Sequence, residues 1–220
     1  MGRFIVIDGL DGSGKETQSL LLKKHLENMG IKVRYISFPC YENDSSIFVK
    51  KYLNGELGSR PEDTNAYAAS SFFAADRYLS YRTDWKKDID DPDTVVIANR
   101  YTTANAVHQL SKLPKEQWNS FLSWLWDYEF YKLGIPVPDQ VIYLEMHPDI
   151  SHRLIKSRAE QTGRTIDIHE ADGSFLHKSY EAALYASDRL NWTRICCYRD
   201  SEPLSIEEIS ECVLSALGYE

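Results

Sequence analysis

Short apolar runs alternate along the chain with longer segments in which apolar residues recur every three or four positions. Within the short runs polar and apolar residues do not alternate, which is typical of parallel strands covered on both faces. The strands that this pattern predicts are residues 4–8, 33–38, 95–98, 140–145 and 194–198.

The longer segments have the spacing of amphipathic helices. The expected helices are residues 18–29, 47–54, 65–85, 115–133, 148–162, 175–190 and 205–217. Gly30 and Gly134 are candidate C-caps, and Ser205 with Glu208 has the spacing of a capping box. Since strands and helices alternate without an internal repeat, we expect an α/β fold: a parallel sheet flanked by helices, with ligands at the carboxyl ends of its strands.

Composition narrows the class of protein. The 220 residues include 25 Lys and Arg against 33 Asp and Glu, a formal net charge of −8, which argues against a general binder of nucleic acids or anionic membranes. The length suits a single domain, residues 1–220. The four cysteines lack C-x-x-C spacing, and no signal peptide or membrane-spanning run is apparent, so we expect a soluble cytoplasmic protein with reduced thiols.

A glycine-rich loop and a lysine follow the first predicted strand. In such a loop successive backbone N–H groups and the start of the next helix can face a phosphate, and Lys15 adds a mobile charge. The candidate phosphate-binding residues are Gly9, Gly12, Ser13, Gly14, Lys15, Glu16 and Thr17. A glycine-rich turn alone is more often an ordinary loop, but here strand, spacing and helix coincide.

One position departs from the usual motif. A Ser or Thr is expected after the lysine as a Mg²⁺ ligand, whereas this chain has Glu16 followed by Thr17. Either residue could serve the metal, directly or through water, and the sequence leaves this open.

Phe73 and Arg77 lie one helical turn apart in a predicted helix. A ring beside a guanidinium suits a nucleobase, because the ring can stack on the base and the guanidinium can donate to a base carbonyl. The alternative is that Phe73 is a core residue and Arg77 is solvated. Considered without other motifs, the spacing of these two residues favours this alternative.

Several motifs occur together in one order. These are G-L-D-G-S-G-K at 9–15, F-P at 38–39, F-x-x-x-R at 73–77, R-Y at 100–101 and V-P-D-Q-V-I-Y-L at 137–144. In this order they resemble the thymidylate kinase family, from the first strand to the last helix. The resemblance implies a three-layer P-loop fold with a five-stranded parallel sheet and a small mobile lid, and ATP- and Mg²⁺-dependent phosphorylation of dTMP to dTDP.

The resemblance also assigns roles. It implies that Lys15 and the loop amides bind ATP phosphates, and that Asp11 reaches the deoxyribose hydroxyl. It implies that Phe73 stacks on thymine, that Arg77 contacts the base carbonyl and that Arg100 clamps the acceptor phosphate. Further acceptor contacts implied by it are Phe38, Pro39, Tyr101, Asn105, His108 and Tyr180.

Catalytic arginines are expected from the lid, at about residues 156–172. Gly12 stands where some members carry a loop arginine, so the chain resembles the subgroup that supplies this charge from the lid. Arg158 and Arg164 would then complete the catalytic set with Lys15 and Arg100.

Three positions differ from the family pattern. Asn99 replaces an Asp near the expected metal, Cys40 stands where relatives often carry a phosphate-binding Arg, and His108 stands where a Tyr or Phe commonly lies under the sugar. We hypothesise that Glu16 supplies through a water the charge that Asn99 lacks. The equal alternative is that Glu16 points to solvent in the first helical turn.

Aromatic residues crowd the segment from Trp118 to Tyr131, and Trp124 and Trp126 lie off its apolar stripe. Surplus apolar surface suggests a partner, and the family resemblance implies a homodimer packed through helices. Two other functions stay open at this point. One is a kinase of the same fold with another nucleotide or nucleoside acceptor, and the other is a nucleotide-binding regulatory protein without catalysis.

Overall fold

The structure is a computed structural model that describes residues 2–163, 168–171 and 173–219. The strands are β1 (Phe4–Gly9), β2 (Lys32–Ser37), β3 (Thr94–Asn99), β4 (Gln140–Glu145), β5 (Thr193–Cys196), β6 (Tyr198–Arg199) and β7 (Glu202–Pro203). The α-helices are α1 (Lys15–Asn28), α2 (Ile47–Leu53), α3 (Ala66–Ser80), α4 (Lys86–Asp90), α5 (Thr102–Ala104), α6 (Trp118–Trp126), α7 (Pro148–Thr162), α8 (Ile168–Ala171), α9 (Gly173–Arg189) and α10 (Ile206–Leu217).

Five parallel strands form the central sheet, as the apolar runs predict. Their order in the sheet is β2-β3-β1-β4-β5. All six residues of β1 are buried, since both its faces are covered. Ile5 and Ile7 pack toward one layer of helices, while Phe4 and Val6 pack toward the other. β1 lies between β3 and β4, so the strand order reverses there and the loop after β1 opens at the switch point where α/β proteins bind ligands.

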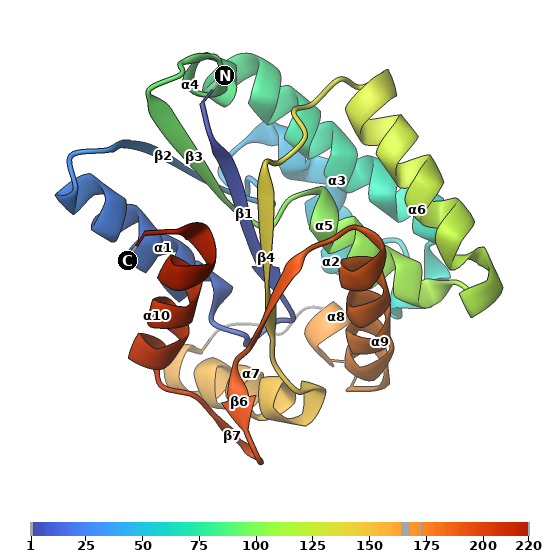
Figure 1. Cartoon of the computed structure of the whole chain (residues 1–220). Helices are drawn as coiled ribbons and strands as arrows, with labels where there is room; N and C mark the ends of the chain where they lie inside the picture. The colour runs from blue at the N-terminus through green and yellow to red at the C-terminus, as the bar shows by residue number, and fades with distance from the viewer. Residues whose placement is uncertain (1, 164–167, 172, 220) are drawn as a thin grey trace.

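Helices cover both faces of the sheet and make three layers (Figure 1). α1 and α10 pack on the Ile5 and Ile7 side, whereas α3, α6 and α9 lie on the opposite side (Figure 1). Ser205 caps α10 in the predicted capping box, and Gly30 and Gly134 take the left-handed conformation expected at helix ends.

Several boundaries differ from the sequence prediction. π-helical turns follow α3, α5 and α6, at Tyr81–Trp85, Asn105–Gln109 and Asp127–Lys132. The last predicted strand ends early, because Tyr198 pairs with Pro203 in the small β6–β7 hairpin, whose turn contains Asp200 at a φ of 54°. Such short pairs and widened turns leave no periodic signal in the sequence.

Trp124 is half-buried and packs against other aromatic rings, so the expectation that it is surplus apolar surface was largely wrong. Its ring lies 4.7 Å from that of Tyr67 and 5.1 Å from that of Tyr128, between centroids. Trp126 and Tyr131 are exposed, by 36% and 75%. The apolar surface that α6 leaves at the exterior is therefore smaller than the sequence suggests.

Across the described ranges of the chain, none of the helices combines the length and the apolar character that a membrane crossing requires.

Candidate active site

The glycine-rich loop joins β1 to α1 at the switch point. Gly12 and Gly14 have φ values of 79° and 83°, which side-chain-bearing residues rarely adopt. A Cβ on Gly12 would lie 2.8 Å from the carbonyl oxygen of Ser151, so the loop also packs closely against α7. α1 begins at Lys15, and the N–H groups of its first turn have no partner within the helix, so this end of α1 is suited to an anion.

Lys15 reaches back across this loop. Its Nζ donates to the carbonyl oxygen of Leu10 at 3.1 Å and to Oδ1 of Asp11 at 3.2 Å. Burial, followed by the charge of Arg100, lowers the pKa of Lys15. Gly9 packs closely against Ser13, since a Cβ on Gly9 would lie 2.5 Å from Ser13 Oγ.

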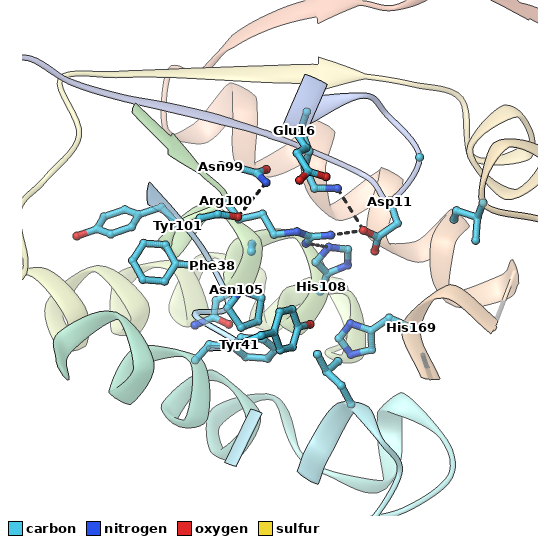
Figure 2. Close-up of a pocket in the computed structure, with 18 of the residues that line it drawn as sticks. Asp11, Glu16, Phe38, Tyr41, Asn99, Arg100, Tyr101, Asn105, His108 and His169 are labelled. Atoms are coloured by element: carbon cyan, nitrogen blue, oxygen red, sulfur yellow. Dashed lines mark hydrogen bonds and ion pairs between the residues drawn. The ribbon is translucent and has the colours of Figure 1, made fainter. Parts of the chain in front are cut away.

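Arg100 directly follows β3 and has a φ of 64°. This left-handed conformation costs a non-glycine residue roughly 1–2 kcal/mol, and strain of this kind gathers at functional sites. The backbone N–H of Arg100 donates to the carbonyl oxygen of Ile7 at 3.0 Å and anchors it to β1. Its guanidinium lies between Asp11 and His108, paired with Asp11 Oδ1 and 3.0 Å from His108 Nε2 (Figure 2).

The charges in this cluster are well defined. Because a guanidinium can only donate, His108 Nε2 accepts from Arg100 and the imidazole is neutral. Burial, and next the charge of Arg100, lowers the pKa of His108 to about 3. Burial alone would raise the pKa of Asp11, but Arg100 and Lys15 hold it well below its ordinary value. Lys15 and Arg100 thus place two cationic side chains at the wall of one cavity, next to the carboxylates of Asp11 and Asp8, and such cations can pair with an anionic ligand.

Arg77 and Asn105 line the other end of the cavity and share a buried partner, Glu129. The Arg77 guanidinium donates to both oxygens of Glu129, at 2.7 and 2.6 Å, and to the carbonyl oxygen of Tyr101 at 3.2 Å. These contacts use three of its five N–H donors. The side-chain amide of Asn105 donates to Glu129 at 3.0 Å and to the carbonyl oxygen of Ser70 at 3.2 Å.

His169 of α8 is buried against the same cavity. Its ring stacks on His108 with centroids 5.4 Å apart, and its Nε2 lies 2.7 Å from the hydroxyl of Tyr52. That hydroxyl also accepts from Lys112 at 2.7 Å. Burial and the neighbouring His108 lower the pKa of His169. These contacts join α8, which lies within the predicted lid, to the body of the protein.

Oxygen donors for a hydrated divalent cation lie where the loop meets β3. Oδ1 of Asn99 is buried without a hydrogen-bond partner, while its amide donates to Ser37 Oγ at 3.1 Å. The Glu16 carboxylate lies 3.5 Å from Arg158, and both side chains are more than half exposed. Within the described residues no three His, Cys, Asp or Glu side chains gather into a metal cluster. The donors present therefore fit a cation that keeps most of its water and binds through phosphates.

One cavity of about 610 Å³ gathers most of the predicted residues. Its lining includes Asp11, Gly12, Gly14, Lys15, Glu16, Thr17, Phe38, Pro39, Phe73, Arg77, Arg100, Tyr101, Asn105, His108 and Arg158. Residues far apart in the sequence thus converge on a single site, with the loop and the Arg77 pocket joined through Arg100.

One expected acceptor contact, Tyr180, lies outside the cavity. The Tyr180 hydroxyl donates to Glu145 at 2.7 Å, and this ring is not among the cavity's lining residues. Cys40 faces the protein, with its Sγ 3.4 Å from Ser80 Oγ, and burial raises the pKa of the thiol to about 11. Arg164 lies outside the described residues.

Sequence reasoning missed Glu129 and His169. Glu129 continues the apolar stripe of Leu122 and Leu125, and an acidic residue on a buried stripe is a signal that could have marked it. His169 had no comparable signal, because its partners Tyr52 and His108 are distant in the sequence.

Comparisons with known proteins find relatives that cover most of the chain. Residues 7–203 match the family model described as thymidylate kinase. The thymidylate kinase of Mycobacterium tuberculosis is 28% identical over 184 residues, 83% of each chain, and that of Plasmodium falciparum is 27% identical over 183 residues, 81% of this chain and 80% of the other.

Among solved structures, a thymidylate kinase from Candida albicans superposes with a TM-score of 0.69 at 19% identity, covering 99% of this chain and 91% of that one. At this identity the likeness supports the fold alone. The family model, however, spans most of the sequence, and the chain therefore belongs to the thymidylate kinase family.

Proposed function

We propose that this protein transfers the γ-phosphoryl group of ATP to dTMP and produces dTDP and ADP. The observation that carries the proposal is the position of Arg100: it lies in one cavity between a phosphate-binding loop and a pocket lined by Phe73 and Arg77. Membership of the thymidylate kinase family supports the same reaction.

In this proposal the donor phosphates bind to the loop N–H groups and Lys15, and the acceptor phosphate binds to Arg100. Asp11 accepts from the sugar hydroxyl, and Phe73 stacks on the base. An oxygen of the acceptor phosphate, already ionised, bonds to the γ-phosphorus as the bond to the ADP oxygen breaks, so no general base is needed. The protein contributes position and positive charge around the transferred group.

Arg158 and Arg164 are proposed to supply part of that charge from a lid at about residues 156–172 of a single domain. Arg158 lies at the rim of the cavity, where its pairing with exposed Glu16 is readily exchanged for a phosphate. Mg²⁺ would be held by ATP phosphates, with Glu16, Thr17 or the Asn99 oxygen reached through water, and would neutralise charge on the phosphates.

We also propose that the protein is cytoplasmic and forms a homodimer through helices. Its four cysteines are free thiols, which suits a reducing compartment. The exposed rings of Trp126, at the end of α6, and of Tyr131, in the π-helical turn that follows, provide apolar surface for a second copy.

The function is tested by identifying the product. Protein incubated with Mg²⁺-ATP and dTMP should form dTDP, detected by chromatography. The Arg100→Ala variant should lose at least about 99% of that rate, because a charged contact that positions a reacting phosphate is worth roughly a hundredfold or more. Binding of both nucleotides without dTDP would instead support a regulatory role.

A further inference from the structure

Glu129 lies on the π-helical turn Asp127–Lys132 and has no exposed surface, while its partner Arg77 is 1% exposed. The two make a bidentate ion pair with both contacts below 2.8 Å. Removing two charges from water costs much of the free energy that their attraction provides, so a buried ion pair contributes little net stability. Its geometry calls for another explanation.

A third contact supplies one. Glu129 Oε1 also accepts from the Asn105 amide, whose second N–H goes to the carbonyl oxygen of Ser70. In the opposite amide orientation, the Asn105 oxygen would face the Glu129 carboxylate and the Ser70 carbonyl oxygen, which are both acceptors. Repulsion between these oxygens excludes that orientation, so the observed one is determined by its surroundings. Both N–H groups are thus used, and the group that Asn105 can offer to the cavity is its Oδ1 acceptor.

Glu129 therefore fixes two neighbouring groups at once. Arg77 keeps N–H donors for a ligand, and Asn105 presents an acceptor beside them. The imide edge of thymine or uracil has a carbonyl acceptor next to the N3–H donor, which matches this pair. Cytosine has the reverse arrangement, with an amino donor next to an N3 acceptor.

We propose that Glu129 is a positioning residue that sets the hydrogen-bonding polarity of the base pocket, so that the pocket accepts an imide-bearing pyrimidine nucleotide and rejects a cytosine nucleotide. This rests on the proposed function in so far as a nucleobase occupies the pocket. A role limited to neutralising Arg77 would not require the contact to the neutral Asn105 amide.

The first test is Glu129→Gln, assayed by calorimetric binding of dTMP and dCMP. A glutamine amide has one acceptor oxygen where the Glu129 carboxylate has two, and its N–H opposes the donors of Arg77 or Asn105. We expect the Kd of dTMP to rise roughly tenfold to a hundredfold, the loss typical of a hydrogen bond to a charged group, while dCMP binding falls less. The preference for dTMP over dCMP should therefore narrow.

Asp127→Asn is the matched control. It removes a carboxylate from the same turn, but Asp127 is exposed and pairs only with Lys132 among the described residues. This variant should retain the dTMP affinity and the dTMP preference of the wild type.

A charge swap tests the geometry more sharply. Asn105→Asp places a second carboxyl against Glu129 and the Arg77 guanidinium, so it must hold a proton to keep the contact. Relative to wild type at the same pH, this variant should bind dTMP better at pH 5.5 than at pH 8. Glu129→Gln combined with Asn105→Asp restores one carboxylate, which accepts from the introduced glutamine amide, and should bind dTMP at least about tenfold more tightly than the two single losses together predict.

Circular dichroism melting accompanies each variant, and if Glu129→Gln does not fold, the pH comparison in Asn105→Asp carries the test. Equal losses for dTMP and dCMP, additive effects in the double variant, or no pH difference in Asn105→Asp would each overturn the proposal. The Glu129 proposal is tested by nucleotide binding, whereas the proposed function is tested by dTDP formation. A failure of the Glu129 proposal can therefore be distinguished from a failure of the proposed function.

Discussion

Arg100 lines the cavity between the glycine-rich loop and the Arg77 pocket. Its left-handed backbone, anchored to Ile7, directs the guanidinium between Asp11 and His108. Arg100 and Lys15 line the same cavity, and these two cations can pair with a phosphate even in a chain whose formal net charge is −8.

The neutral His108 makes stability depend on pH. Its folded pKa is about 3, against an ordinary value of about 6.5, so between these values the unfolded chain binds a proton that the folded chain does not. The free energy of unfolding therefore falls as pH falls from about 6.5 toward 3. His169, whose pKa is also lowered by burial, acts in the same direction.

His108→Phe removes one of these two groups while keeping an aromatic ring beside His169 and Phe175. We expect its melting temperature to fall less than that of the wild type between pH 7 and pH 4, measured by calorimetry in matched buffers. Identical slopes for the two proteins would contradict a buried neutral His108.

Residues within local motifs could be predicted from the sequence, whereas those defined by distant partners could not. Lys15, Phe73 and Arg100 lie where their motifs indicate. Glu129 meets Arg77 across 52 residues and His169 meets Tyr52 across 117, so no short stretch of sequence reports either contact.

At the level of elements, the loop between β1 and α1 lines the cavity and also packs against α7. Gly12 contacts α7 through Ser151, so the loop is held in place by the helix that carries Arg158. Gly14 faces open space.

Gly12→Ala and Gly14→Ala form a matched pair. Both force alanine to a positive φ, at a cost of about 1 kcal/mol, but only the methyl group added to Gly12 also meets the Ser151 carbonyl oxygen, at 2.8 Å. Gly14→Ala should lower the melting temperature of the protein by about 2–4 °C and Gly12→Ala by clearly more, in thermal unfolding without nucleotide. Equal shifts would show that the loop yields without disturbing α7.

Glu16 at the start of α1 and Asn99 at the end of β3 test the metal hypothesis together. If Glu16 supplies the charge that Asn99 lacks, Glu16→Ser should raise the Mg²⁺ concentration for half-maximal rate, and adding Asn99→Asp should bring it back down. The measurement is a Mg²⁺ titration of ADP release. Purely additive effects would leave Glu16 as a solvent-facing partner of Arg158.

For the elements themselves, apolar periodicity predicted the strands and long helices, because burial on both faces of a parallel sheet imposes it. The π-helical turn Asn105–Gln109 was not predicted, although it carries three residues that line the cavity, Asn105, His108 and Gln109. A widened turn has no period of its own and is determined by packing against α3 and α9.

For the whole molecule, the alternation of elements predicted the three-layer α/β class, and the motifs predicted which end of the sheet holds the site. The union of the loop and the base pocket in one cavity depends on the strand order, which brings the ends of β1 and β3 side by side. That union is the physical basis for transferring a group between two bound nucleotides.

The most direct test is steady-state ADP release from Mg²⁺-ATP with dTMP, dUMP, dGMP, UMP and thymidine as acceptors, in wild type and Arg100→Ala. We expect the highest kcat/KM with dTMP and a loss of roughly a hundredfold or more in the variant. Highest turnover with another acceptor, or equal rates in the two proteins, would contradict the proposed function.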